Sequence, residues 1–209
     1  MLEAQGLGAV RGDRRLFAGL NFSLDGGELL YVHGPNGSGK TTLLRMLCGL
    51  VMPAEGEVRW RGETIRRLGD EYRRELLYLG HTVALKDDLT GLENLRIASA
   101  LQGAAVHEAQ AGEALAALGL TGFEDLPVRV LSQGQKRRVA LARLQLSLQL
   151  GRACLWILDE PFTALDKAAI GVLEAVLAAH LEGGGIVVLT THQEVALTAG
   201  VTKEIAMGG

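Results

Sequence analysis

The chain has 209 residues and an apolar content of 48%, which is enough for one packed core, and its net charge of −3 gives no reason to expect nucleic acid as a partner. No run of roughly 18 uncharged apolar residues occurs, and the N-terminal stretch MLEAQGLG lacks the basic and apolar parts of a signal peptide. We therefore expect a single domain over residues 1–209 that is soluble or reaches a membrane only through a partner.

A phosphate-binding loop is the first strong pattern along the chain. The apolar segment ELLYVH at 28–33 predicts a buried strand, and KTTLLRMLCGL at 40–50 has helical spacing. Between them, GPNGSGKTT fits the pattern G-x-x-x-x-G-K-[ST], whose glycines let backbone N–H groups surround phosphate oxygens at a helix N-terminus. We expect Lys40 to face the β- and γ-phosphates of ATP and the Thr41 hydroxyl to bind Mg²⁺. The predicted ATP-binding residues of this loop are Gly34, Pro35, Asn36, Gly37, Ser38, Gly39, Lys40, Thr41 and Thr42.

The next part of the chain changes from strand-like to helical. EVRW at 57–60 alternates as an edge strand does. Further along, TGLENLRIASALQG, HEAQAGEALAALGL and QGQKRRVALARLQLSLQL are rich in Ala and Leu with glycine at their ends, which is typical of helices. We interpret residues from about 82 to 148 as a helical subdomain inserted into an α/β core formed by residues 1–80 and 149–209.

After this helical region, a strand ends on two carboxylates. CLWILDE at 154–160 predicts a buried strand that brings Asp159 and Glu160 to the phosphate edge. Asp159 is expected to hold Mg²⁺ directly or through water, and Glu160 to orient and deprotonate the water that attacks the γ-phosphate. The remaining predicted elements are a helix at 167–182 and strands at 186–191 and 201–207.

The histidines differ in where the predicted elements place them. His192 follows an apolar strand that should end at the same phosphate edge, so we expect it to contact the γ-phosphate as a catalytic residue. His33 is expected to lie in the strand before the phosphate loop. His107 and His180 are predicted to be surface residues of helices.

The cysteines and the local basic clusters are interpreted as structural features. Cys48 and Cys154 lie inside apolar runs, so we expect buried free thiols in a reducing compartment. The basic clusters at 66–67, 73–74 and 136–138 are predicted to be solvated helix faces and not binding patches.

Four motifs in this order resemble the ATP-binding subunits of ABC transporters over nearly the whole chain. After the phosphate loop, LSQGQ at 131–135 resembles that family's signature loop, EPFTALD at 160–166 its D-loop with Asp166, and TTHQ at 190–193 its switch histidine. The resemblance implies an α/β fold: a P-loop NTPase core with a RecA-like sheet and helices, an N-terminal antiparallel β part and an inserted helical signature subdomain. It also implies ATP and Mg²⁺ as cofactors and ATP hydrolysis as the reaction.

The resemblance also explains why the chain carries a second glycine-containing loop before a helix. In this family two domains pack head to tail, and the signature loop of one caps the ATP bound by the other. It therefore implies a homodimer on ATP binding, in which Ser132, Gly134 and Gln135 complete the site of the partner copy. The residue types agree, because a hydroxyl, a glycine and a helix N-terminus suit an anion.

Two positions depart from the family pattern. His81 stands where most ABC subunits carry glutamine, and we expect its imidazole to act as the γ-phosphate and metal sensor through a Mg²⁺-bound water. Arg11 is the nearest match to the aromatic residue that stacks on adenine. Its planar guanidinium could stack on the base, or the adenine could be loosely held, and the sequence leaves both open.

Within the family, the chain is most similar to the haem-exporter ATP-binding subunits of cytochrome c maturation. The small size, GH at 80–81, LTGLENL, RRVALARL, LWILDEPFTALD and TTHQ carry this resemblance. It implies haem export, integral membrane partner subunits, and a peripheral location on the cytoplasmic face of the bacterial inner membrane. No haem-ligand motif occurs in the sequence, so haem rests on the resemblance alone. We expect residues 81–92 to receive a short helix of the membrane partner.

Other functions stay open at this point. The chain could be the ATPase subunit of a different small-molecule or lipid exporter, or a soluble ABC ATPase that does not serve transport. A nucleotide kinase would need an acceptor-substrate site and has no use for LSQGQ.

Overall fold

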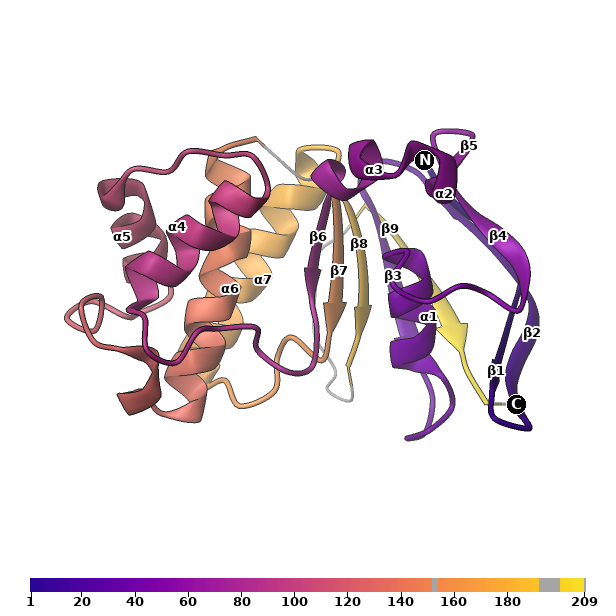
Figure 1. The fold of residues 1–209 in the computed structure, drawn as a ribbon, viewed down its shortest axis with the longest axis horizontal. Helices are drawn as coiled ribbons and strands as arrows, with labels where there is room; N and C mark the ends of the chain where they lie inside the picture. The colour runs from indigo at the N-terminus through magenta and orange to yellow at the C-terminus, as the bar shows by residue number, and fades with distance from the viewer. Residues whose placement is uncertain (152–153, 192–199, 209) are drawn as a thin grey trace.

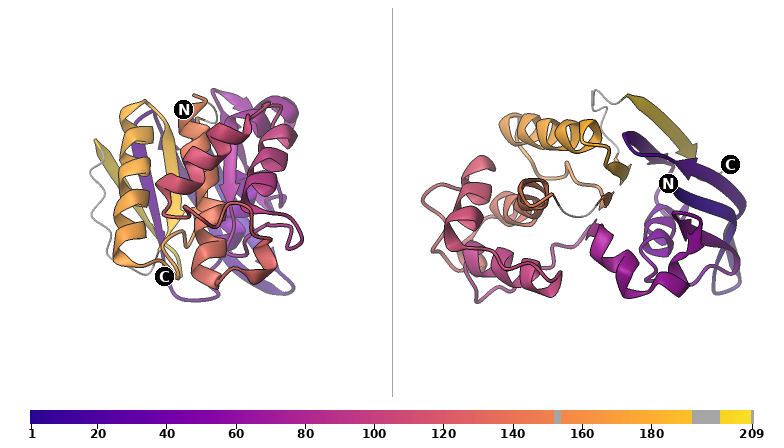
Figure 2. Two further views of the ribbon diagram at one scale, coloured as in Figure 1. Left: turned by 90° about the vertical axis from the view of Figure 1, so that its left-hand side faces the viewer. Right: turned by 90° about the horizontal axis from the view of Figure 1, so that it is seen from above.

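The computed structural model describes residues 1–151, 154–191 and 200–208 (Figure 1). An antiparallel sheet lies at one end of the molecule, a parallel sheet in the middle, and a group of helices at the other end (Figures 1 and 2). The fold is thus the expected α/β P-loop NTPase core with an antiparallel β part and a helical subdomain.

The parallel sheet positions the phosphate loop and the two carboxylates. Its strand order is β6-β7-β8-β3-β9, and all neighbouring pairs run parallel. The strands are β3 (Glu28–His33), β6 (Leu76–Leu79), β7 (Leu155–Asp159), β8 (Ile186–Thr190) and β9 (Val201–Ala206). Strands of one direction end at one edge, so the loops after β3, β6 and β7 gather there.

Both faces of this sheet are covered. In β7, Leu155 and Ile157 pack in the same apolar cluster as α1 (Lys40–Leu47), which lies between the two sheets (Figure 1). Trp156 and Leu158 belong to the opposite cluster, with apolar residues of α6 (Gln133–Gln149) and α7 (Lys167–Glu182). A strand that is buried on both sides reads as a continuous apolar run, which is why CLWIL predicted it well.

The antiparallel sheet has the strand order β2-β1-β4-β5. Its strands are β1 (Leu2–Arg11), β2 (Arg14–Leu24), β4 (Glu55–Trp60) and β5 (Glu63–Thr64). The prediction of an edge strand at 57–60 was wrong, because the two-residue strand β5 pairs with the outer side of β4.

The helical region of the sequence forms three α-helices that pack together beside the sheet (Figure 1). They are α4 (Gly91–Leu101), α5 (Glu108–Ala117) and α6, with a 3₁₀ turn at Val128–Val130. The short helices α2 (Ile65–Leu68) and α3 (Asp70–Glu75) lead into β6. Among the described residues, no helix is long and apolar enough to cross a membrane.

His180 corrects one prediction from the sequence. It is 6% exposed and stacks on Trp156 with ring centroids 3.7 Å apart and planes 4° from parallel. Gly185 leaves room for this stack, since a Cβ there would lie 2.2 Å from His180 Nε2. Burial lowers the pKa of His180 to about 4, so the ring is a neutral core residue at neutral pH and not a surface group.

The two cysteines also differ from each other. Cys48 is buried as expected, and burial raises the pKa of its thiol. The expectation for Cys154 was wrong, because this residue is exposed. It directly precedes β7, whose fully buried part begins only at Leu155.

Candidate nucleotide site

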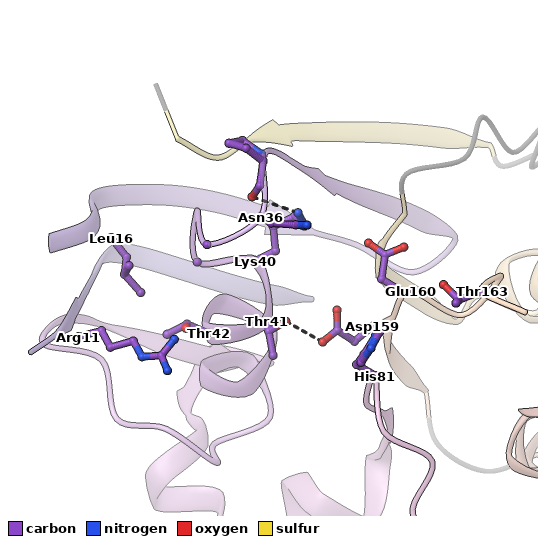
Figure 3. Close-up of a pocket in the computed structure, with 13 residues that line it drawn as sticks. Arg11, Leu16, Asn36, Lys40, Thr41, Thr42, His81, Asp159, Glu160 and Thr163 are labelled. Atoms are coloured by element: carbon purple, nitrogen blue, oxygen red, sulfur yellow. Dashed lines mark hydrogen bonds between the residues drawn. The ribbon is translucent and has the colours of Figure 1, made fainter. Parts of the chain in front are cut away.

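A cavity of about 400 Å³ lies at the carboxyl edge of the parallel sheet (Figure 3). The phosphate loop follows β3, Asp159 ends β7, and His81 comes shortly after β6. Arg11 and Leu16, from the antiparallel sheet, form the opposite wall. Ligands of open α/β sheets bind at this edge, so the topology and the cavity indicate the same site.

Most residues that were predicted to bind ATP or metal line this cavity. They are Arg11, Pro35, Asn36, Gly37, Gly39, Lys40, Thr41, Thr42, His81, Asp159 and Glu160. Gly34 and Ser38 are not among the lining residues, and they lie close together, since a Cβ on Gly34 would come within 2.8 Å of Ser38 Oγ. Sequence reasoning missed two lining residues, Leu16 and Thr163. Thr163 lies three residues after Glu160 in EPFTALD and was within reach of the motif, whereas Leu16 carried no signal.

The phosphate loop adopts a shape that needs its glycines. Gly34, Gly37 and Gly39 have φ values of 141°, 80° and 104°, a region that other residues rarely enter. Lys40 is buried, and its Nζ donates hydrogen bonds to the carbonyl oxygens of Gly34 at 2.6 Å and Pro35 at 3.3 Å. The ammonium is therefore held by the loop itself, close to where the phosphates are expected.

Asp159 sits at the centre of a short hydrogen-bond chain. Thr41 Oγ1 donates to Asp159 Oδ2 at 2.8 Å, and Thr190 Oγ1 donates to Asp159 Oδ1 at 2.7 Å (Figure 3 shows the first). The backbone N–H of Glu160 in turn donates to Thr190 Oγ1 at 2.9 Å. Two predicted Mg²⁺ ligands, Thr41 and Asp159, are thus in contact. A hydroxyl, one carboxylate and the phosphate oxygens of a nucleotide are the oxygen donors that Mg²⁺ accepts.

Glu160 and His81 line the cavity on either side of Asp159 (Figure 3). Glu160 has a φ of 52°, a left-handed conformation that is strained for a residue with a side chain. The strained conformation places the Glu160 carboxylate directly after Asp159, the predicted metal ligand, at the lining of the cavity. Non-glycine outliers of this kind concentrate at functional sites.

Arg137 corrects the expectation that cluster 136–138 is a solvated helix face. It is 6% exposed and donates hydrogen bonds to backbone carbonyls beside the cavity, including that of Glu160 at 2.6 Å. A signal was available, because Arg137 lies four residues before Leu141 and seven before Leu144, two buried residues of α6. The clusters at 66–67 and 73–74 are exposed as expected.

Arg11 lies at the wall of the cavity opposite His81 and Glu160 (Figure 3). It is exposed, so its guanidinium has room to meet a flat ring. Phe17 packs beneath the phosphate loop, since a Cβ on Gly39 would lie 3.2 Å from its ring. Stacking of Arg11 on adenine stays a prediction.

The signature residues do not reach this cavity. Ser132, Gly134 and Gln135, all within the described part of the chain, are not among the residues that line it. Ser132 is the N-cap of α6: its Oγ accepts a hydrogen bond from Gln135 N at 3.2 Å, and its own N–H donates to Gln135 Oε1 at 2.8 Å. Gly134 leaves space for the D-loop, because a Cβ there would lie 3.1 Å from the carbonyl oxygen of Ala164.

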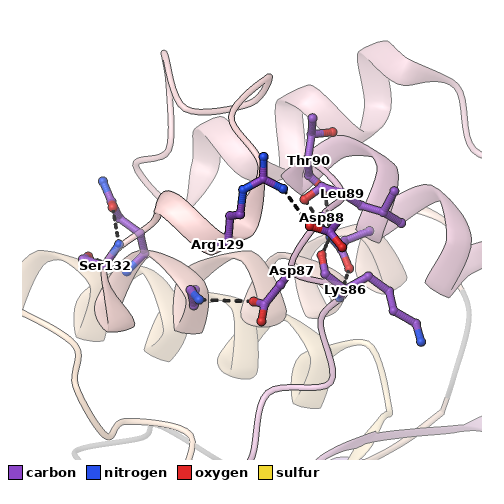
Figure 4. Close-up of polar contacts among 10 residues, drawn as sticks. Lys86, Asp87, Asp88, Leu89, Thr90, Arg129 and Ser132 are labelled. Atoms are coloured by element: carbon purple, nitrogen blue, oxygen red, sulfur yellow. Dashed lines mark hydrogen bonds and ion pairs between the residues drawn. The ribbon is translucent and has the colours of Figure 1, made fainter.

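Charged and polar contacts tie the signature segment to its neighbours. Lys136 pairs with Asp87 at 3.2 Å, and Arg129 pairs with Asp88 at 2.6 Å (Figure 4). In the D-loop, Asp166 caps α7, and its hydrogen bond from the N–H of Ala169, together with an ion pair to the α6 residue Arg138, lowers the pKa of its carboxyl. The start of α6 is thus fixed on two sides. His192 lies outside the described residues.

Comparisons with known proteins cover nearly the whole chain. The family model described as "ABC transporter" matches residues 17–163. The chain is 55% identical to the cytochrome c biogenesis ATP-binding export protein CcmA of Nitrosomonas europaea, in an alignment that covers 95% of this chain and 91% of the relative. It is 54% identical to the protein of the same name from Dechloromonas aromatica, with 100% of both covered.

Solved structures share the fold at lower identity. A dimeric bacterial ABC transporter cassette superposes with a TM-score of 0.82 at 25% identity, covering 100% of this chain and 97% of that chain. A dimeric ATP-binding cassette in a post-hydrolysis state, bound to ADP and phosphate, superposes with a TM-score of 0.79 at 27% identity, covering 92% and 88%.

Proposed function

Because the chain belongs to the ABC transporter family and, within it, to the cytochrome c biogenesis ATP-binding export proteins, we propose that it is the ATP-hydrolysing subunit of an export complex in cytochrome c biogenesis. The exported cargo in this proposal is haem, and closure of an ATP-bound homodimer drives integral membrane partner subunits. The chain acts at the cytoplasmic face of the bacterial inner membrane. Two relatives, matched over 91% and 100% of their own length, are named as cytochrome c biogenesis ATP-binding export proteins, which disfavours a different exporter or a non-transport ATPase.

Each functional residue around the cavity has its own role in the proposed reaction. Lys40 binds the β- and γ-phosphates, and Thr41 and Asp159 hold Mg²⁺, which when bound offsets the negative charge of the phosphates. Glu160 accepts a proton from water as the water oxygen attacks the γ-phosphorus. The bond to the β–γ bridging oxygen then breaks, which leaves ADP and phosphate. His192 is proposed to contact the γ-phosphate.

The observation that carries this proposal is the separation of the two loops. The cavity is lined by the phosphate loop and the carboxylates, whereas Ser132, Gly134 and Gln135 lie outside it at the start of α6, where Ser132 is exposed and the other two are half-buried. A second copy packed head to tail would bring these groups onto the open side of the nucleotide. Two solved relatives of the same fold are dimers, which supports this arrangement.

Mixing two inactive variants tests the shared site. Lys40→Ala destroys the phosphate-binding side and Ser132→Arg blocks the signature side, so each homodimer should be inactive. A heterodimer keeps one intact site, made of the Lys40 of one copy and the Ser132 of the other. The mixture should therefore recover up to roughly a quarter of wild-type ATP turnover if dimers form at random. No recovery, together with no ATP-dependent dimer in light scattering, would falsify the proposal.

His81 is proposed to sense the γ-phosphate and the metal. It lines the cavity close to Asp159 and Glu160, where an imidazole can hydrogen-bond a metal-bound water. We expect His81→Ala to lose ATP turnover and transport coupling, and His81→Gln to keep part of both. The role is rejected if His81→Ala retains full activity.

The loop at 81–92 is proposed to dock onto a membrane subunit. Leu85 packs partly against the core, whereas Leu89 lines a groove of about 400 Å³ beside α4. Leu89→Asp is the cleaner test, because Leu85→Asp also disturbs packing. Membrane recruitment should fall with ATP binding intact, while Val10→Asp, an exposed change in β1, should leave recruitment unchanged.

Copurification from membranes, with identification of bound proteins and pigment, tests the haem-export assignment.

A further inference from the structure

Arg137 is a buried cation, and within the described part of the chain its hydrogen bonds go to backbone carbonyls at the nucleotide edge. Its Nη2 donates to Glu160 O at 2.6 Å and to Asp159 O at 3.1 Å. Its Nη1 donates to Gly80 O at 3.2 Å and, at the long limit of 3.5 Å, to His81 O. The two nitrogens therefore hold the ends of two neighbouring strands, β7 and β6.

This arrangement uses the shape of the guanidinium. Its fork is planar and rigid, so fixing one strand end also fixes the direction of the other nitrogen. A lysine has one ammonium on a flexible stem and cannot hold both strand ends in one geometry. The two held segments carry the side chains of His81 and Glu160, which line the nucleotide cavity.

Burying the charge of Arg137 costs desolvation free energy, and filling space in the core does not require a charged side chain. Burial lowers the pKa of Arg137, and the nearby negative charges of Asp159 and Glu160 oppose that shift. An apolar side chain at this position would avoid the desolvation. The backbone that Arg137 holds includes Glu160, whose φ of 52° is strained and needs support from its surroundings.

The same helix carries the signature segment. Arg137 lies five residues after Ser132, the N-cap of α6, and the helix between them is continuous. If Ser132 contacts ATP bound to a second copy, a rigid α6 connects that contact to the backbone of Glu160 in its own chain. This step rests on the proposed function.

We infer that Arg137 is a positioning residue: it sets the backbone of Glu160 and His81 and links the catalytic edge to the position of the signature helix. It touches neither nucleotide nor water in this role. Its loss should therefore affect the rate of hydrolysis and leave the affinity for ATP, which depends on Lys40 and its loop, nearly unchanged.

The test compares Arg137→Gln and Arg137→Lys with Arg143→Gln. Arg143 is a second arginine of α6 whose pKa is lowered by burial, and it lines a small pocket with Ser147 and Leu150 and not the nucleotide cavity. For Arg137→Gln we expect kcat per folded molecule to fall roughly 10- to 100-fold with KM for ATP changed less than about threefold, because a misplaced base slows the chemical step without removing binding groups. Arg137→Lys should lie between this variant and wild type, and Arg143→Gln should keep the wild-type kcat.

Hydrogen exchange supplies a readout that does not require hydrolysis. The amides of residues 80, 81, 160, 162 and 163 should exchange faster in Arg137→Gln, but not in Arg143→Gln, than in wild type. Wild-type protein without ATPase activity would refute the proposed function, and the exchange result would still decide this inference. Unchanged exchange at these amides overturns it, as does an Arg137→Gln protein with wild-type kcat or one that matches Arg143→Gln in every measurement.

Discussion

The phosphate loop and the signature segment each lead into a helix, α1 and α6, and the N-termini of these two helices differ in how they are capped. The N-cap of α1 is Gly39, which has no side chain to accept a hydrogen bond, and the loop before the helix wraps a buried lysine. The N-cap of α6 is Ser132, which is exposed and forms a complete capping box with Gln135. The N-terminus of α1 leaves its N–H groups to a ligand, whereas at the N-terminus of α6 the N–H groups of Ser132 and Gln135 are already bonded within the chain.

The difference in capping indicates which of the two helix N-termini is stabilised by a bound nucleotide. The start of α1 gathers uncapped donors and a positive charge, an arrangement that an anion stabilises. The start of α6 is stable without a ligand, and the Ser132 hydroxyl, which accepts a hydrogen bond from Gln135 N, can still donate its own hydrogen to an oxygen of a second molecule. We therefore expect the loop before α1 to bind nucleotide in the monomer and the start of α6 to complete a site in a second copy.

The largest expected effect comes from the carboxylate beside the α1 loop. Glu160→Gln removes the proposed base but preserves size and polarity, so ATP turnover should fall by roughly 10³-fold, within the usual range for a general base. ATP affinity should be retained, and ATP should trap a dimer. Single-turnover hydrolysis and size-exclusion chromatography with ATP measure the two properties. Rapid hydrolysis by this variant would remove Glu160 from the mechanism.

Two lysines, one at the start of each helix, provide the next test of this difference. Lys40 opens α1 and Lys136 lies in the first turn of α6, where it pairs with Asp87. Lys40→Ala should weaken ATP binding about 100-fold, since loss of a charge-assisted contact costs about 2–3 kcal/mol. Lys136→Ala should leave the dissociation constant of the monomer unchanged. Titration with a fluorescent nucleotide separates them, and equal losses would mean that α6 also binds nucleotide in its own chain.

The features of these regions that could be predicted are those that leave a local pattern in the sequence. The phosphate loop and β7 were predictable because a glycine-spaced motif and a doubly buried strand leave strong local signals. Arg137 and His180 were assigned to the surface by residue type, although both lie at helical spacing from buried leucines. Their burial depends on partners distant in sequence, such as the carbonyl of Glu160 and the ring of Trp156. For these two residues the prediction gave more weight to residue type than to helical periodicity. The structure shows that periodicity was the better guide.

The stability of the parallel sheet, which carries the loop before α1, is expected to depend on pH through His180. Burial lowers the pKa of His180 to about 4, whereas an unfolded chain protonates this residue near its ordinary value of 6.5. The neutral ring therefore contributes stability that is fully present above pH 6.5 and is lost as pH falls towards 4. Between pH 7 and pH 5 this loss should be about 2 kcal/mol.

Denaturant unfolding at both pH values measures this loss. His180→Phe keeps an aromatic ring against Trp156 but cannot titrate, so its free energy of unfolding should fall less than that of wild type. His107→Asn, at the exposed N-cap of α5, should follow wild type. An identical pH dependence in wild type and His180→Phe would show that the buried histidine does not control acid stability.

The smallest expected effect separates capping from catalysis at the start of α6. The helices α4 and α6 both begin with a capping box whose N-cap is a hydroxyl residue. Thr90 Oγ1 accepts a hydrogen bond from Glu93 N at 3.1 Å, and Ser132 Oγ accepts one from Gln135 N at 3.2 Å. Thr90→Ala and Ser132→Ala should each lower the free energy of unfolding by about 1 kcal/mol, because each removes one cap. Only Ser132→Ala should also reduce ATP turnover of the dimer, by several-fold, since only its hydroxyl is proposed to reach the nucleotide of a second copy.

The variant Ser132→Asp takes the same separation further. Aspartate caps helices as well as serine does, so the stability of this protein should stay close to that of wild type. Its negative charge would face the phosphates of the ATP in the partner copy, and turnover should fall below that of Ser132→Ala for electrostatic reasons. ATP binding by the monomer should be unchanged, because Ser132 does not line its own cavity. If turnover in these variants follows unfolding stability and not the charge at position 132, then the start of α6 is only a well-capped helix, and the contrast with α1 has no part in catalysis.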